Sequence, residues 1–86
     1  MVSPLERSIR EHIRDYVAGR LSLGELDDWL WPATQQIEEI NDPGARDLTY
    51  EIILRIAEYD KGHRSDAEVK VLLQPFAAPL PAIANR

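Results

Sequence analysis

The chain repeats its own pattern after 43 residues, and this internal similarity constrains the fold more than any other feature of the sequence. Each copy reads as a helix, a glycine, a capped second helix and a proline. The glycines are Gly19 and Gly62, and the prolines are Pro32 and Pro75. The other identical pairs are Leu5 and Leu48, Ile9 and Ile52, Ile13 and Ile56, Tyr16 and Tyr59, Ser22 and Ser65, Glu25 and Glu68, and Leu30 and Leu73. Two copies of this pattern predict two αα-hairpins.

Apolar spacing and capping residues define the helices of the first copy. We expect a helix from Pro4 to about Ala18, because apolar residues recur there at three- and four-residue steps and Gly19 follows. Three Ser-x-x-Glu segments predict capping boxes at helix starts; they begin at Ser3, Ser22 and Ser65. The second helix starts at the middle one, and Pro32 should end or kink it near Trp31.

The second copy predicts two further helices. The third should run from about Pro43 to Lys61, and the fourth should follow Ser65 and continue to about Gln74. Residues 33–40, between the copies, should form a short helix or a kinked continuation of the second helix. The third helix is more apolar than the first, so we expect it to be the central one, with the first helix outside.

These elements predict an all-α protein, a four-helix bundle built from two duplicated αα-hairpins. No segment alternates apolar and polar residues with a period of two, which argues against strands. We expect one domain over residues 1–76 and a Pro/Ala-rich C-terminal tail over residues 77–86. A solenoid is the rival architecture, although solenoids usually need three or more repeats.

Composition excludes several classes of protein. The 86 residues include no cysteine, so disulfides and thiolate metal sites are excluded. No apolar run approaches the roughly 18 residues of a membrane-spanning helix, and the charged start does not resemble a signal peptide. We therefore expect a soluble cytoplasmic protein that does not bind a membrane.

Negative charge is concentrated in the first copy. The net charge of the chain is −5, and no lysine or arginine lies between Arg20 and Arg46. A nucleic-acid binder carries a basic surface, so we expect no nucleic-acid partner. An acidic region can instead steer a basic protein toward the chain, and it can equally be a solvated surface that aids solubility.

The sequence offers little for catalysis, and we expect neither an enzyme, a metal site nor a cofactor. The two histidines, His12 and His63, have no ligand partner at helical spacing. The neighbouring carboxylates Asp27 and Asp28 diverge on a helix, as do Glu38 and Glu39. A bundle this small should have little room for a catalytic pocket.

The repeat separates expected core aromatics from an unusual one. Trp29 aligns with Leu72, so it should be core, and both tyrosines of the Tyr16 and Tyr59 pair should pack with their hydroxyls near the following loops. Trp31 aligns with the polar Gln74. It is either an exposed binding anchor beside Asp27 and Asp28 or a residue that closes the bundle at the proline, and its exposure decides between the two.

The segment Tyr16-x-x-Gly19-x-x-Ser22-x-x-Glu25-Leu26-x-x-Trp29 resembles the turn between helices in small immunity proteins of bacterial toxin systems, of the colicin D immunity type. The resemblance covers about residues 5–32, with an echo at 48–75. It implies a helical bundle that binds and blocks a basic nuclease toxin through an acidic surface. It assigns no role to individual residues.

The sequence therefore favours a small acidic protein-binding module, most specifically an immunity-type inhibitor of a basic partner protein. The residues expected to contact that partner are Asp27, Asp28, Trp31, Glu38, Glu39 and Asp42. The alternative is a structural or self-assembling bundle, typically a homodimer. Its contact would comprise Trp31, Phe76, Leu80 and Ile83.

Overall fold

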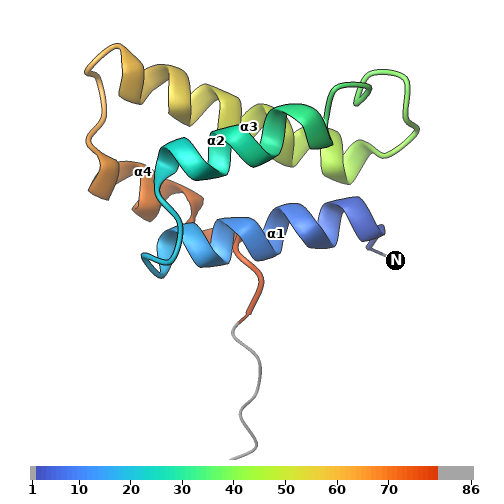
Figure 1. The fold of residues 1–86 in the computed structure, drawn as a ribbon, viewed down its shortest axis with the longest axis horizontal. Helices are drawn as coiled ribbons and strands as arrows, with labels where there is room; N and C mark the ends of the chain where they lie inside the picture. Colours follow the sequence, from blue (N-terminus) through green and yellow to red (C-terminus); the bar gives the residue numbers. More distant parts are fainter. Residues whose placement is uncertain (1, 80–86) are drawn as a thin grey trace, which may run out of the picture.

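The computed structural model describes residues 2–79, which contain four α-helices and no strand. The helices are α1 (Pro4–Val17), α2 (Leu23–Ala33), α3 (Pro43–Asp60) and α4 (Asp66–Leu73), followed by a short 3₁₀ helix, η1 (Gln74–Phe76). In Figure 1, α1 and α3 begin at one end of the molecule and α2 begins at the other. The all-α four-helix fold is confirmed, whereas the duplication of its two hairpins stays a prediction.

Side-chain caps begin the helices where the sequence predicted. Ser22 and Ser65 each form a complete capping box with the glutamate three residues later. Ser3 caps α1 by accepting the Glu6 N–H, but the Glu6 carboxylate accepts instead from Arg10 Nε, 3.1 Å away, so the third capping box is only half formed.

Two glycines end the first helix of each hairpin. Gly19 and Gly62 have φ angles of 84° and 78°, a left-handed conformation that residues with a Cβ adopt at a cost. Any larger residue at either position would strain the turn that reverses the chain.

The segment after α2 differs from the expectation. Pro32 lies inside α2, which continues to Ala33. Thr34 caps the end of the helix, because its backbone N–H and its hydroxyl both donate hydrogen bonds to the Leu30 carbonyl. Residues 34–39 then form successive turns rather than a helix, with Ile37 buried beneath them. Pro32 has no N–H to donate to the carbonyl four residues earlier, and α2 ends one residue after it, close to where the sequence predicted.

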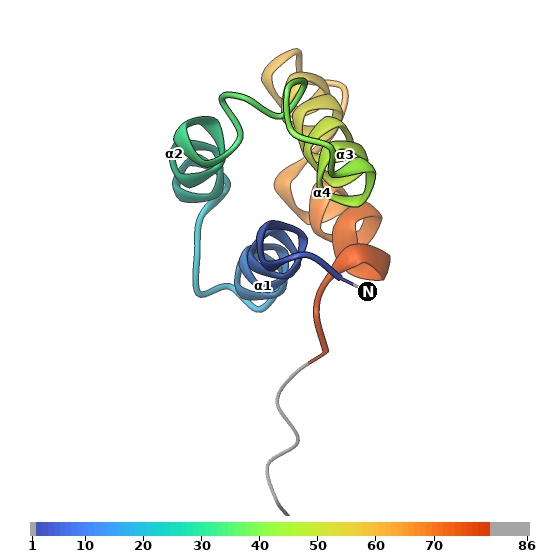
Figure 2. The same cartoon turned by 90° about the vertical axis from the view of Figure 1, so that its right-hand side faces the viewer.

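The central helix is α1, and the expectation that α3 is central was wrong. The helix α3 contacts each of the other three helices. So does α1, which also packs against η1; Figure 2 shows it with α2 to its upper left and α3 and α4 to its upper right. Its residues Ile9, Ile13 and Tyr16 are fully buried. In α3, by contrast, Tyr50 and Leu54 are exposed. A narrow, fully buried stripe thus occupies the centre, while the broader apolar surface of α3 remains partly in solvent.

Contacts to the core continue past residue 76, the expected domain boundary. Phe76 is half-buried against the core, and its carbonyl accepts from Arg10. The backbone N–H of Ala78 donates to the Arg10 carbonyl over 3.0 Å. Leu80 and Ile83, predicted as possible contacts of the tail, lie outside the described residues.

Trp29 is half-buried and packs against the core as expected, with one feature that the sequence did not predict. Its ring stacks on His12 of α1, with centroids 3.6 Å apart and planes 12° apart. His12 Nδ1 lies 2.7 Å from the Ser8 carbonyl, which holds the imidazole in this orientation. This stack joins α1 to α2 at the edge of the core.

Candidate binding cleft between α2 and α3

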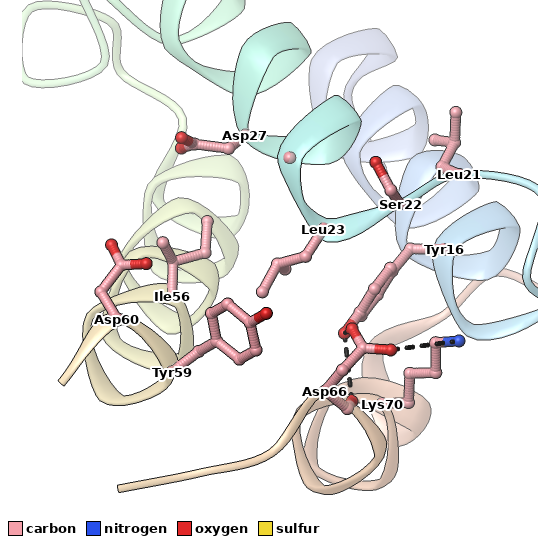
Figure 3. Close-up of a pocket in the computed structure, with 11 residues that line it drawn as sticks. Tyr16, Leu21, Ser22, Leu23, Asp27, Ile56, Tyr59, Asp60, Asp66 and Lys70 are labelled. Carbon is pink, nitrogen blue, oxygen red and sulfur yellow. Dashed lines mark hydrogen bonds and ion pairs between the residues drawn. The ribbon is translucent and has the colours of Figure 1, made fainter. Parts of the chain in front are cut away.

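A hollow of about 540 Å³ opens where the start of α2 and the end of α3 meet the start of α4 (Figure 3). Its apolar wall is formed by Leu23 and Ile56. The Tyr59 ring stands in the middle of the close-up, and its side chain is 42% exposed. The bundle thus holds more open space than the sequence led us to expect.

A second hollow of about 210 Å³ continues along the same two helices and is lined by Trp31. Asp27, Ile56 and Asp60 line both hollows, so the two form one groove, which we call the α2–α3 cleft. Trp31 is 55% exposed. Its exposure excludes a role in closing the bundle, and exposure is what a binding anchor requires.

The cleft is acidic. Its lining contains Asp27, Asp60 and Asp66 but a single base, Lys70, whose ammonium is 3.5 Å from Asp66. Within residues 2–79, no ion pair includes Asp27 or Asp60. Asp60 is also the last residue of α3, whose last turn has no basic side chain, so the negative end of the helix dipole adds to its charge.

Tyr16 anchors one end of the cleft. Its hydroxyl donates to the Asp66 carboxylate over 2.6 Å, which ties the end of α1 to the start of α4. Burial of the phenol, and secondarily this hydrogen bond, raise the pKa of Tyr16 well above its ordinary value. We expected this hydroxyl to reach the following loop, but it reaches a residue fifty positions away. Tyr59, expected to pack, is instead an exposed wall of the cleft.

Replacing Tyr16 by phenylalanine should lower the free energy of unfolding by about 1–2 kcal/mol at neutral pH, because a hydrogen bond to a charged acceptor is lost. Folding raises the pKa of Tyr16, so the protonated phenol contributes stability at pH values below about 10, the pKa of tyrosine in the unfolded chain. This contribution is lost as the pH rises above that value. The difference in free energy of unfolding between wild type and Tyr16→Phe should therefore become smaller above pH 10. Urea unfolding of both proteins between neutral pH and pH 11 measures this difference. A difference that does not change with pH would contradict a stabilising role for the protonated Tyr16 hydroxyl.

The other predicted contact residues lie apart from the cleft. Asp28 is exposed on α2 and Glu39 is exposed in the turns after it. Glu38 accepts from the Tyr50 hydroxyl, beside the first half of α3, and this hydrogen bond raises the pKa of Tyr50. Of the six residues, the fold brings only Asp27 and Trp31 together in the cleft.

Asp42 is the N-cap of α3, and both of its carboxylate oxygens are engaged within the fold. One accepts the Ala45 N–H over 3.1 Å, and the other accepts the Ser3 hydroxyl. Because Ser3 caps α1, a single hydrogen-bonded pair joins the starts of α1 and α3. Whether a partner contacts Asp42 as well stays a prediction.

Sequence reasoning missed Asp60 and the exposed role of Tyr59. Asp60 is 33 positions from Asp27 and belongs to the other copy of the repeat, so no spacing rule connects them. One available signal was the alignment of the copies, which places Asp27 opposite Lys70 and thus marks a position where the charge differs in sign.

No group of three or more potential ligands in residues 2–79 could hold a metal ion, and Ser22 at the cleft is used as a helix cap. None of the helices in this range is long and apolar enough to cross a membrane. No family model, curated protein or solved structure matches the chain. The resemblance to immunity proteins therefore rests on the motif alone.

Proposed function

We propose that the chain is a small acidic module that binds a basic protein through the α2–α3 cleft and neutralises it, in the manner of an immunity-type inhibitor. The observation that supports this proposal is a juxtaposition. The carboxylates of Asp27 and Asp60, without ion pairs in the described part of the chain, line the same groove as the exposed ring of Trp31.

Each part of this juxtaposition has a defined energetic role. Exposed carboxylates attract a basic protein over about 8–10 Å at physiological salt and so accelerate its association. Tryptophan and tyrosine are the aromatic residues most often found as binding hot spots, because they bury a large area at little conformational cost. The cleft combines Trp31 and Tyr59 with the two carboxylates, which suits a partner surface of basic and apolar side chains.

A pull-down at low salt tests the proposal, with wild type, Asp27→Lys and Asp47→Lys as baits. Asp47 is 78% exposed on α3 and does not line the cleft, so its reversal changes the net charge by the same amount elsewhere. A captured basic protein is then purified, and its association is measured at several salt concentrations. Asp27→Lys should slow association about tenfold or more and flatten the salt dependence, whereas Asp47→Lys should stay close to wild type.

Inhibition is measured on the same captured protein. Its own activity should fall when wild-type chain is added in equal amount, and this fall should be weaker with Asp27→Lys. Equal behaviour of the two charge reversals would contradict a specific acidic cleft, and an unaffected partner activity would remove the inhibitory role.

A second candidate function is self-assembly, and one observation favours it. Tyr50 and Leu54 are 45% and 49% exposed, one turn apart on α3, and so form an apolar strip outside the cleft. The contact predicted from sequence is weakened, because Phe76 is half-buried against the core of its own chain. Sedimentation at two concentrations distinguishes the candidates: a concentration-dependent dimer supports assembly, and a monomer throughout supports the partner-binding function.

A further inference from the structure

The two tyrosines of the cleft occupy equivalent positions of the two sequence copies but differ in exposure, since Tyr16 is buried and Tyr59 is 42% exposed. The Lys70 ammonium lies 5.4 Å from the centre of the Tyr16 ring and 3.5 Å from the Asp66 carboxylate. One end of the cleft therefore already holds a cation between an aromatic face and an aspartate, and Figure 3 shows this group around Tyr16. Such a cation is attracted both by the ring and by the carboxylate.

At the other end, no lysine or arginine of residues 2–79 lines the cleft. Tyr59 follows Tyr16 by 43 positions, and Lys70 follows Asp27 by the same 43, so the sequence position that provides an ammonium beside Tyr16 provides a carboxylate, Asp27, in the lining of the hollow that Tyr59 also lines. Asp60 adds a second carboxylate at the negative end of α3. Lys61 comes next in sequence but does not line either hollow.

We propose that the Tyr59 end of the cleft binds one arginine side chain of the basic partner, with its guanidinium between Asp27 and Asp60. This inference rests on the proposed function and specifies the partner's chemistry. The arginine supplies from outside the cation that Lys70 supplies at the Tyr16 end.

Arginine fits this end better than lysine for three reasons. Its planar guanidinium has five donors, enough to reach carboxylates on both α2 and α3. Its flat face stacks on the exposed Tyr59 ring, or on Trp31 in the adjoining hollow. Its methylene groups lie along the apolar wall of Leu23 and Ile56. The charges of the cleft agree with this. Lys70 and Asp66 neutralise each other, which leaves the two negative charges of Asp27 and Asp60, and one arginine would offset one of them.

The test is a titration of the full chain, labelled with ¹⁵N, with N-acetyl-arginine amide at constant ionic strength and followed by amide chemical shifts. The lysine amide and the neutral isostere citrulline amide serve as matched ligands. Arginine amide should produce saturable shifts at Leu23, Ile56 and Tyr59 with a dissociation constant in the millimolar range, roughly −4 kcal/mol or weaker. Lysine amide should bind more weakly, and citrulline amide should give no saturable shift.

Isosteric variants locate the site. Asp27→Asn and Asp60→Asn should each weaken arginine amide binding about tenfold, because each removes a charge-assisted hydrogen bond. Asp47→Asn, remote from the cleft, should leave binding unchanged. Equal shifts with arginine and citrulline amides, shifts outside the cleft, or no saturable shift would each overturn the proposal.

The outcome is separable from that of the proposed function. If Asp27→Lys abolishes partner association but arginine amide does not bind the cleft, the partner function stands and the arginine assignment fails. If arginine amide binds as described but no partner depends on Asp27, the site stands and the inhibitory function fails.

Discussion

Replacing Ile13 by alanine should lower the free energy of unfolding by about 3–4 kcal/mol. Ile13 is fully buried in α1, which contacts the three other helices and η1, so the shortened side chain leaves a cavity that several elements would have to move to fill. A domain of this size is stable by only about 5–10 kcal/mol, so the loss is a large fraction of the total. Chemical denaturation followed by circular dichroism measures it.

The repeat provides a matched control for this substitution. Ile56 is the same residue 43 positions later, but it is half-buried at the edge of the cleft. Ile56→Ala should therefore cost only about 1–2 kcal/mol, since less apolar area returns to water. Equal losses at the two positions would contradict the central place of α1.

Replacing Asp42 by alanine should lower the free energy of unfolding by about 2 kcal/mol. The change removes the N-cap of α3, worth about 1 kcal/mol, and the hydrogen bond from Ser3 that joins the starts of α1 and α3. Thermal unfolding should show a lower midpoint, together with faster amide exchange in the first turn of α3.

Asparagine at the same position separates the cap from the charge. Asp42→Asn keeps an acceptor for the helix N-terminus and should cost less than about 1 kcal/mol. Partner association should be little changed in the asparagine variant, because Asp42 does not line the cleft. If Asp42→Asn instead bound the partner much more weakly with unchanged stability, Asp42 would be part of the surface that contacts the partner.

Local signals of the sequence predicted the helices well, because capping and chain reversal depend on neighbouring residues alone. Ser22 and Ser65 cap their helices as expected, and Gly19 and Gly62 take the left-handed conformation that ends α1 and α3. The same local reasoning failed after Pro32, where helix-forming residues form turns instead. Residues 34–39 pass from α2 toward the start of α3 as successive turns, with Ile37 buried beneath them.

The candidate site was predicted only in part. Asp27 and Trp31 are four positions apart on one helix, so helical geometry alone places them on one side of α2. Asp60 and Tyr59 join them only because α2 packs against the end of α3. Glu38 and Asp42 belong to the same acidic stretch of sequence, yet one pairs with Tyr50 and the other caps α3.

The sequence by itself determined the all-α class, the helix starts and the glycine reversals, because each depends on contacts within a few residues. The tertiary structure decided which helix is central and which acids meet in the cleft. Overall apolar content does not determine how completely a helix is covered: α3 is the more apolar helix but leaves Tyr50 and Leu54 exposed, whereas the α1 residues that face α2, α3, α4 and η1 include three fully buried side chains. The acidic residues of the sequence likewise form a candidate site only where the packing of α2 and α3 places Asp27 and Asp60 in the same cleft as exposed aromatic rings.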